Sequence, residues 1–171
     1  WFTNIDFTIV GSGIVGLNCA LELQKKHPKA KVLILEKGML PQGASTKNAG
    51  FACFGSLSEI IDDLKSHTEQ EVYNLVDKRW KGLKLLRKNL GDKNIDFQPN
   101  KGFELCESKA FFEEFITEKE AINQLLKPIF KDDVFSVCAN RFGFQKVHQQ
   151  YIVNNFEGQI DTGKMASELL K

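Results

Sequence analysis

A glycine-rich hexapeptide near the start of the chain constrains the fold more than any other feature. It follows a short β-rich run at residues 5–10, and it fits the pattern GxGxxG with Gly11, Ser12, Gly13, Ile14, Val15 and Gly16. Apolar residues at helical spacing come next, and Pro28 forbids continuation of that helix. A nearly continuous apolar run at residues 31–36 is typical of a strand buried on both faces. Strand, helix and strand in this order predict a βαβ unit, and therefore an α/β fold of Rossmann type.

Each glycine of the hexapeptide has a separate role in such a unit. The first permits a tight turn, the second lets the backbone approach a pyrophosphate, and the third lets the helix pack on the strand. Backbone N–H groups at the helix N-terminus then meet the phosphate charge. Glu36 ends the second run, where a carboxylate can accept hydrogen bonds from an adenosine ribose and would repel the 2′-phosphate of NADP. We therefore predict that the hexapeptide, Glu36 and the adjacent Lys37 bind a dinucleotide.

The segment after the second run distinguishes FAD from NAD. A plain NAD-binding domain usually continues to a helix and a third strand, whereas a loop rich in small residues extends here from Gly38 to Ser56. Its residues 41–51, PQGASTKNAGF, resemble the D-amino-acid oxidase superfamily, which includes glycine oxidase, sarcosine oxidase and D-amino-acid dehydrogenase. Members carry a GAS-x-x-N-x-G-like stretch soon after the ribose-binding acid. Residues 156–161, FEGQID, are similar to a turn of the same family that leads into a helix.

The resemblance implies that FAD is the cofactor and that the loop follows it. It places Ala44 and Ser45 near the phosphates and ribityl chain, and Ala49, Gly50 and Phe51 near the isoalloxazine ring. Small residues suit this role because they let backbone approach a flat ring. No histidine occupies the position through which some relatives tether FAD, so we expect dissociable flavin.

Two polar residues of the flavin loop have alternative interpretations. Lys47, the only cation in the loop, either stabilises negative charge on a reduced flavin or is a solvated lysine, and the second is favoured. Asn48 either contacts the cofactor or stabilises the turn through its own side chain.

The rest of the chain predicts helices at about 57–66, 68–90 and 109–126, the second opening with a capping box at Thr68–Glu71 and the third stopped by Pro128. Residues 103–106 alternate like a strand, and residues 134–160 predict strand and loop. We assign residues 1–56 to the FAD-binding unit and flavin loop, 57–155 to a helical and α+β substrate or cap region, and 156–171 to a segment returning to the FAD-binding domain. Both ends look cut, so we expect the N-terminal part of a longer protein.

Arg79 falls within an apolar stripe of the second long helix. At helical spacing, the stripe contains Val72, Leu75, Val76, Leu83, Leu86 and Leu90. A guanidinium on that face needs an anionic or carbonyl partner. A substrate carboxylate or the flavin is one candidate. The favoured alternatives are a structural Asp or Glu as partner, or a side chain that reaches the edge of the stripe.

Composition and residue spacing exclude several other classes of function. The formal net charge is +1 with no basic block, which argues against nucleic acid as a partner. No apolar run is long enough to cross a bilayer. The four cysteines are too widely spaced for a disulfide framework and predict reduced, mostly buried thiols in a cytoplasmic protein. The three histidines lack ligand spacing, so we expect no metal site.

These features predict an FAD-dependent oxidoreductase that oxidises a small-molecule amine or amino acid by hydride transfer to flavin N5. No catalytic residue can be assigned. Two alternatives remain open. One is a flavin- or NAD-dependent dehydrogenase of an unrelated substrate, such as a hydroxy acid, and the other is a dinucleotide-binding subunit without turnover.

Overall fold

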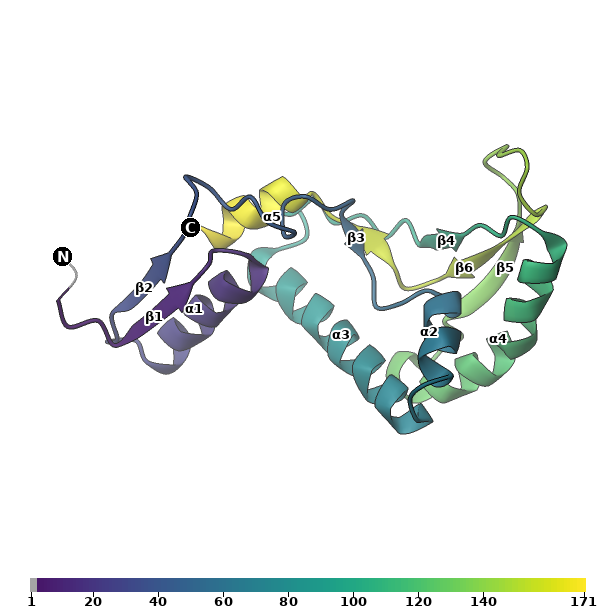
Figure 1. Ribbon diagram of the computed structural model, residues 1–171, viewed down its shortest axis with the longest axis horizontal. Coiled ribbons are helices and arrows are strands. Elements are labelled where there is room, and N and C mark those ends of the chain that lie inside the picture. The colour runs from purple at the N-terminus through teal and green to yellow at the C-terminus, as the bar shows by residue number, and fades with distance from the viewer. Residues whose placement is uncertain (1–2) are drawn as a thin grey trace. The chain divides into compact units, whose positions relative to one another are not determined.

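A computed structural model describes residues 3–171 (Figure 1). The chain forms two compact units. Unit 1 comprises the residues up to Gly50 together with Asn89–Phe97 and Ile160–Lys171. Unit 2 comprises Phe51–Lys88 and Gln98–Gln159. The chain therefore passes between the units four times, and residues distant in sequence meet within each.

Unit 1 contains the predicted βαβ arrangement. Strands β1 (Phe7–Val10) and β2 (Val32–Leu35) pair in parallel, and helix α1 (Ile14–Lys26) connects them. Helix α5 (Thr162–Leu169) contacts α1. Buried apolar side chains come from both helices: Leu17, Ala20, Met165 and Ala166. The expectation that the second run is buried on both faces is wrong for the described residues, because β2 has one neighbouring strand and its side chains are half-buried or exposed.

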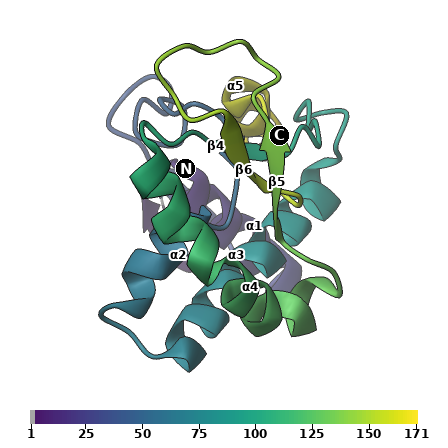
Figure 2. The same ribbon diagram turned by 90° about the vertical axis from the view of Figure 1, so that its right-hand side faces the viewer.

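Unit 2 is built on an antiparallel sheet of three strands. Its order is β4 (Gly102–Glu104), β6 (Gln150–Asn154) and β5 (Phe135–Ala139). A second, short antiparallel pair joins β3 (Phe51–Ala52) to β7 (Gly158–Gln159). Unit 2 also contains three helices: α2 (Leu57–Leu64), α3 (Glu69–Leu90) and α4 (Lys109–Phe130). Helix α4 contacts both α2 and β5 (Figure 2).

The core of unit 2 is rich in aromatic side chains. The Trp80 ring lies 5.0 Å from that of Phe130 and 5.9 Å from that of Phe54, centroid to centroid. Apolar side chains of the three helices and the sheet surround these rings, including Leu57, Ile60, Val72, Val76, Leu126, Val134, Phe135 and Ile152. The sheet and the helices therefore share one core, which fixes the position of β3 and β7 beside it.

The three helix starts of unit 2 follow from local sequence. The Thr68 hydroxyl and the Glu71 side chain form the predicted capping box at the start of α3. Ser56 and Glu59 form a second capping box at α2, and the Ser108 hydroxyl accepts a hydrogen bond from the Phe111 N–H at α4. These bonds satisfy N–H groups that have no partner inside the helix.

Helix α4 differs from its predicted extent. Pro128 was expected to stop it near residue 126, but the helix continues to Phe130 and ends at Lys131, whose φ of 65° is left-handed. Proline in the last turn removes a single N–H donor from the helix, and Lys131 still donates to the Lys127 carbonyl at 2.9 Å. The helix therefore tolerates the proline.

The cysteines differ in part from expectation. All four are free thiols, but Cys19 and Cys53 are exposed, Cys138 is half-buried and only Cys106 is buried. The prediction of mostly buried thiols is therefore wrong, because Cys19 lies on an exposed face of α1 and Cys53 is an exposed residue just after β3.

Within residues 3–171, no helix combines the length and apolar character that a membrane span requires.

Candidate functional site

The GxGxxG turn of unit 1 has the backbone geometry that its glycines predict. Gly11 has a φ of 95°, and its N–H donates to the Leu35 carbonyl at 2.7 Å, which ties the turn to the end of β2. A Cβ on Gly16 would lie 2.1 Å from the Gly11 carbonyl oxygen. Helix α1 can therefore lie directly on the turn only because residue 16 has no side chain.

The start of α1 presents backbone donors. Its N-cap residue, Gly13, supplies no side-chain cap, and its first turn carries no acidic residue. The Ile14 N–H donates instead to the Ser45 hydroxyl of the flavin loop, at 2.9 Å. The first N–H groups of a helix have no intrahelical acceptor, and together with the helix dipole they form a site for an anion. The arrangement fits one phosphate group of a dinucleotide.

Glu36 contacts the same turn from the end of β2. Its Oε2 accepts hydrogen bonds from the Ser12 N–H at 2.8 Å and from the Ser12 hydroxyl at 2.6 Å, and its Oε1 accepts from the Gly38 N–H at 3.1 Å. These bonds, those from Ser12 foremost, lower the pKa of Glu36 to about 2. The carboxylate is therefore ionised at neutral pH and is held beside the turn, where its remaining lone pairs can accept from ribose hydroxyls.

The flavin loop is shaped by its own polar groups. The Asn48 amide donates to the Ala44 carbonyl at 2.8 Å, and its Oδ1 accepts from the Gly50 N–H at 2.9 Å. This confirms the interpretation that Asn48 stabilises the turn. Lys47, Ala44 and Ala49 are exposed.

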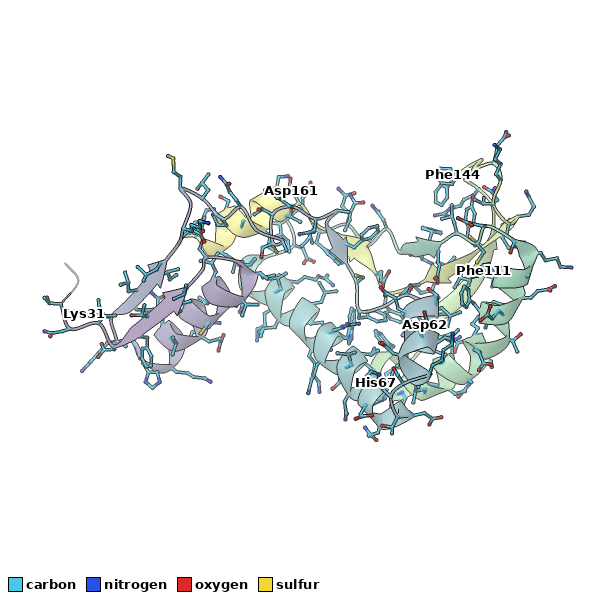
Figure 3. All side chains as sticks on the ribbon, in the orientation of Figure 1. Lys31, Asp62, His67, Phe111, Phe144 and Asp161 are labelled. Atoms are coloured by element: carbon cyan, nitrogen blue, oxygen red, sulfur yellow. The ribbon has the colours of Figure 1, made fainter. Side chains whose placement is uncertain are left out.

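The end of the loop is pinned to the FEGQID segment. The Ile160 N–H donates to the Gly50 carbonyl at 2.8 Å, and a Cβ on Gly50, whose φ is 76°, would lie 2.3 Å from the Ile160 carbonyl oxygen. The next residue, Asp161, caps α5 by accepting from the Lys164 N–H at 2.8 Å (Figure 3). The two segments that carry the family resemblance therefore contact each other directly.

The candidate residues are not all brought together. Ser12, Gly13, Ile14, Ser45 and Glu36 are joined by the contacts above. The side chains of Val15 and Lys37 are exposed, and they take no part in the contacts described above. Phe51 is 71% exposed and begins β3 in unit 2. Sequence reasoning missed the Ser12–Glu36 contact, for which residue spacing gives no signal.

Arg79 has a backbone partner. Its guanidinium Nη1 donates to the Phe54 carbonyl at 3.1 Å, and the side chain is exposed. The partner is a backbone carbonyl rather than the favoured Asp or Glu side chain, and the exposure of Arg79 agrees with the other favoured interpretation, a side chain that reaches the edge of the stripe. The contact ties α3 to the segment that follows β3.

Comparison with known proteins identifies the class. Residues 6–170 match the family model described as FAD-dependent oxidoreductase, abbreviated DAO. The chain belongs to this family, and FAD is the family's cofactor. No curated protein sequence matches the chain.

Solved structures share the fold at low sequence identity. L-amino acid deaminase from Proteus myxofaciens, in complex with anthranilate, matches 99% of this chain with a TM-score of 0.66 and 15% identity. Iminodiacetate oxidase from a Chelativorans species matches 96% with a TM-score of 0.63 and 17% identity. L-proline dehydrogenase from P. horikoshii matches 97% with a TM-score of 0.62 and 17% identity. The chain spans 36%, 43% and 40% of these structures, respectively.

Proposed function

We propose that this chain provides the FAD-binding turn of an enzyme that oxidises an amine or an amino acid. The observation that carries the proposal is the contact between the GxGxxG turn, Ser45 and Glu36 in a chain of the FAD-dependent oxidoreductase family. The names of the three structural neighbours refer to amino acids or to an amino diacid, which favours this substrate class over a hydroxy acid.

Unit 1 is the part that we assign to cofactor binding. The turn at Gly13 and the N–H groups at the start of α1 hold the pyrophosphate, the Ser45 hydroxyl lies beside it, and Glu36 accepts from the adenosine ribose. Lys37 flanks the ribose site. The loop residues Ala44, Lys47, Asn48, Ala49 and Gly50 extend from the phosphates toward the flavin ring, and we include Phe51, the first residue of unit 2, in the same site. Bound FAD supplies the redox chemistry, by accepting a hydride from the carbon next to the substrate nitrogen.

Unit 2 is the part that we assign to substrate binding. We assign Arg79 to the structure of unit 2, where its guanidinium donates to the Phe54 carbonyl, rather than to a substrate carboxylate. The four free thiols favour a reducing compartment, and we infer a cytoplasmic location and small-molecule rather than nucleic-acid partners.

A Gly13→Val substitution tests the cofactor site. The ideal Cβ at residue 13 lies 3.2 Å from the Ser45 Oγ, so the branched side chain of valine occupies the space beside the start of α1. We expect a loss of bound flavin after gel filtration, read from the visible absorption spectrum. Gly82→Val, at an open position of α3, is the matched control and keeps its flavin. Full flavin occupancy in Gly13→Val protein would contradict the assignment.

Anaerobic mixing of the full-length holoenzyme with candidate substrates tests the reaction. The panel contains D- and L-amino acids, N-methyl amino acids, polyamines, hydroxy acids and NADH. We expect loss of the oxidised-flavin absorption with a member of the first three groups. Bleaching by hydroxy acids or NADH alone would support the alternative dehydrogenase, and a flavin that no compound reduces would support the non-catalytic subunit.

A further inference from the structure

Ser12 lies between the first two glycines of the GxGxxG turn and bonds to the end of β2. The Gly11 N–H donates to the Leu35 carbonyl at 2.7 Å, so the residues that follow them, Ser12 and Glu36, lie side by side. The Ser12 hydroxyl donates to the Glu36 Oε2 at 2.6 Å, and the Ser12 N–H donates to the same oxygen at 2.8 Å. Two donors of one residue therefore hold one oxygen of the carboxylate.

The two partners differ in how freely they can move. Ser12 is 5% exposed and belongs to a turn that the Gly11–Leu35 bond fixes, whereas Glu36 is exposed. An exposed glutamate ordinarily samples several rotamers, and a ligand that needs one of them must overcome the entropy of fixing the side chain. Hydrogen bonds to a charged acceptor are strong, so the bonds from Ser12 restrict the Glu36 carboxylate before any ligand arrives.

Hydrogen bonds from neutral groups keep Glu36 ionised. The Ser12 hydroxyl is the largest cause of its low pKa of about 2, followed by the Ser12 N–H and the Gly38 N–H. Burial opposes these bonds, and the Lys37 N–H makes the smallest contribution. A residue without a hydroxyl at position 12 would keep the backbone N–H but lose the largest of these causes, so the pKa of Glu36 should return toward its ordinary 4.5.

We propose that Ser12 is a positioning residue of the cofactor site, whose hydroxyl holds the Glu36 carboxylate in the orientation that accepts from the adenosine ribose of FAD. The inference rests on the proposed function, in which Glu36 is assigned to the ribose. It adds that the affinity for FAD depends on a hydroxyl that acts through another side chain. The backbone of the turn supplies its N–H whatever residue stands at position 12, so the hydroxyl is the contribution of serine itself.

Titration of FAD into the deflavinated full-length protein tests the role of Ser12, with the quenching of flavin fluorescence as the readout. Ser12→Ala should raise the Kd of FAD by about tenfold at pH 7, because the carboxylate loses a charge-assisted hydrogen bond that orients it. Ser66→Ala removes an exposed hydroxyl of unit 2 and is the matched control, which should leave the Kd unchanged.

A double-mutant cycle with Glu36→Ala separates positioning from direct contact. If the Ser12 hydroxyl acts through Glu36, then Ser12→Ala should change the Kd of FAD by less than about twofold once residue 36 is alanine. An equal effect of Ser12→Ala in both backgrounds would mean that the hydroxyl binds FAD itself or supports the turn. That result would overturn the proposal.

The pH dependence of FAD binding provides a readout that a general loss of stability would not imitate. The ratio of the Kd of Ser12→Ala protein to that of wild type should rise by about twofold between pH 7 and pH 4.5, because about half of the Glu36 carboxylate is then protonated in the variant alone. A constant ratio would contradict the role of the hydroxyl. Wild-type protein that binds no FAD would contradict the proposed function itself, whereas FAD binding that Ser12→Ala leaves unchanged would contradict only the role of Ser12.

Discussion

Gly16 and Gly82 are both helical glycines, but their surroundings are opposite. A Cβ on Gly16 would lie 2.1 Å from the Gly11 carbonyl oxygen and 3.3 Å from the Ile9 Cγ2, whereas a Cβ on Gly82 would meet nothing within 4 Å. Gly16→Ala should therefore push α1 off the turn and lower the free energy of unfolding by about 2 kcal/mol. Gly82→Ala should raise it by roughly 0.5–1 kcal/mol, because alanine restricts the unfolded chain and favours helix.

Urea denaturation of the two glycine variants, with flavin retention measured in parallel, checks this difference. Gly16→Ala should also lose flavin, since the N–H groups at the start of α1 move with the helix. A Gly16→Ala protein as stable as Gly82→Ala would show that the turn and helix do not need this close approach.

At the same scale, the sequence predicted glycine roles better than side-chain partners. GxGxxG implies the backbone path because each glycine answers a local steric demand, and Gly11, Gly13 and Gly16 fit that path. The hydrogen bond between Ser12 and Glu36 joins residues that follow two different strands. It depends on the side-chain rotamers, which residue spacing does not encode. The Phe54 carbonyl as partner of Arg79 was equally hidden, although the need for some partner was predictable.

Helix α4 offers a prediction at the scale of one element. The Ser108 hydroxyl accepts from the Phe111 N–H, so Ser108→Ala leaves a helix N-terminus without its cap. We expect a loss of about 1 kcal/mol in the free energy of unfolding, and only a few tenths for Ser108→Gly, because glycine at this position lets water reach the free N–H groups. Chemical denaturation of both variants measures the order, and an alanine variant as stable as wild type would contradict it.

Element boundaries followed the sequence where local chemistry decides them. The capping box at Thr68 marks the start of α3, and α1 ends just before Pro28. The predicted end of α4 before Pro128 was wrong, because the end of a helix depends on how its last turn packs as well as on proline. Strands β3 and β7 have two residues each and show no alternation of their own, so only tertiary pairing defines them. Cys53 was misassigned because it lies just after one of them.

For the whole molecule, two carboxyl groups in different units impose opposite pH dependence on stability. The pKa of Glu36, in unit 1, is lowered to about 2 by hydrogen bonds from Ser12, so its contribution is present above its ordinary pKa of 4.5 and is lost as the pH falls toward 2. The pKa of Glu157, in unit 2, is raised to about 7 by burial. The folded state then holds a proton that the unfolded state releases, so stability falls as the pH rises from 4.5 to 7.

Glu157→Gln should remove the pH dependence of stability that comes from residue 157 and keep the one that comes from Glu36. The amide carries no proton that titrates in this range, so the decrease in the free energy of unfolding between pH 5 and 7.5 should shrink by up to about 3 kcal/mol. All other titratable groups are common to wild type and variant, so the difference between the two curves isolates residue 157. Urea denaturation at the two pH values, with Glu118→Gln as the matched exposed control, measures that difference.

Parallel curves for wild type and Glu157→Gln would mean that the carboxyl group is ionised in the folded protein at pH 5. A folded-state charge of that kind requires a cation or solvent beside Oε1 even without added ligand, because the described protein groups provide no donor to it.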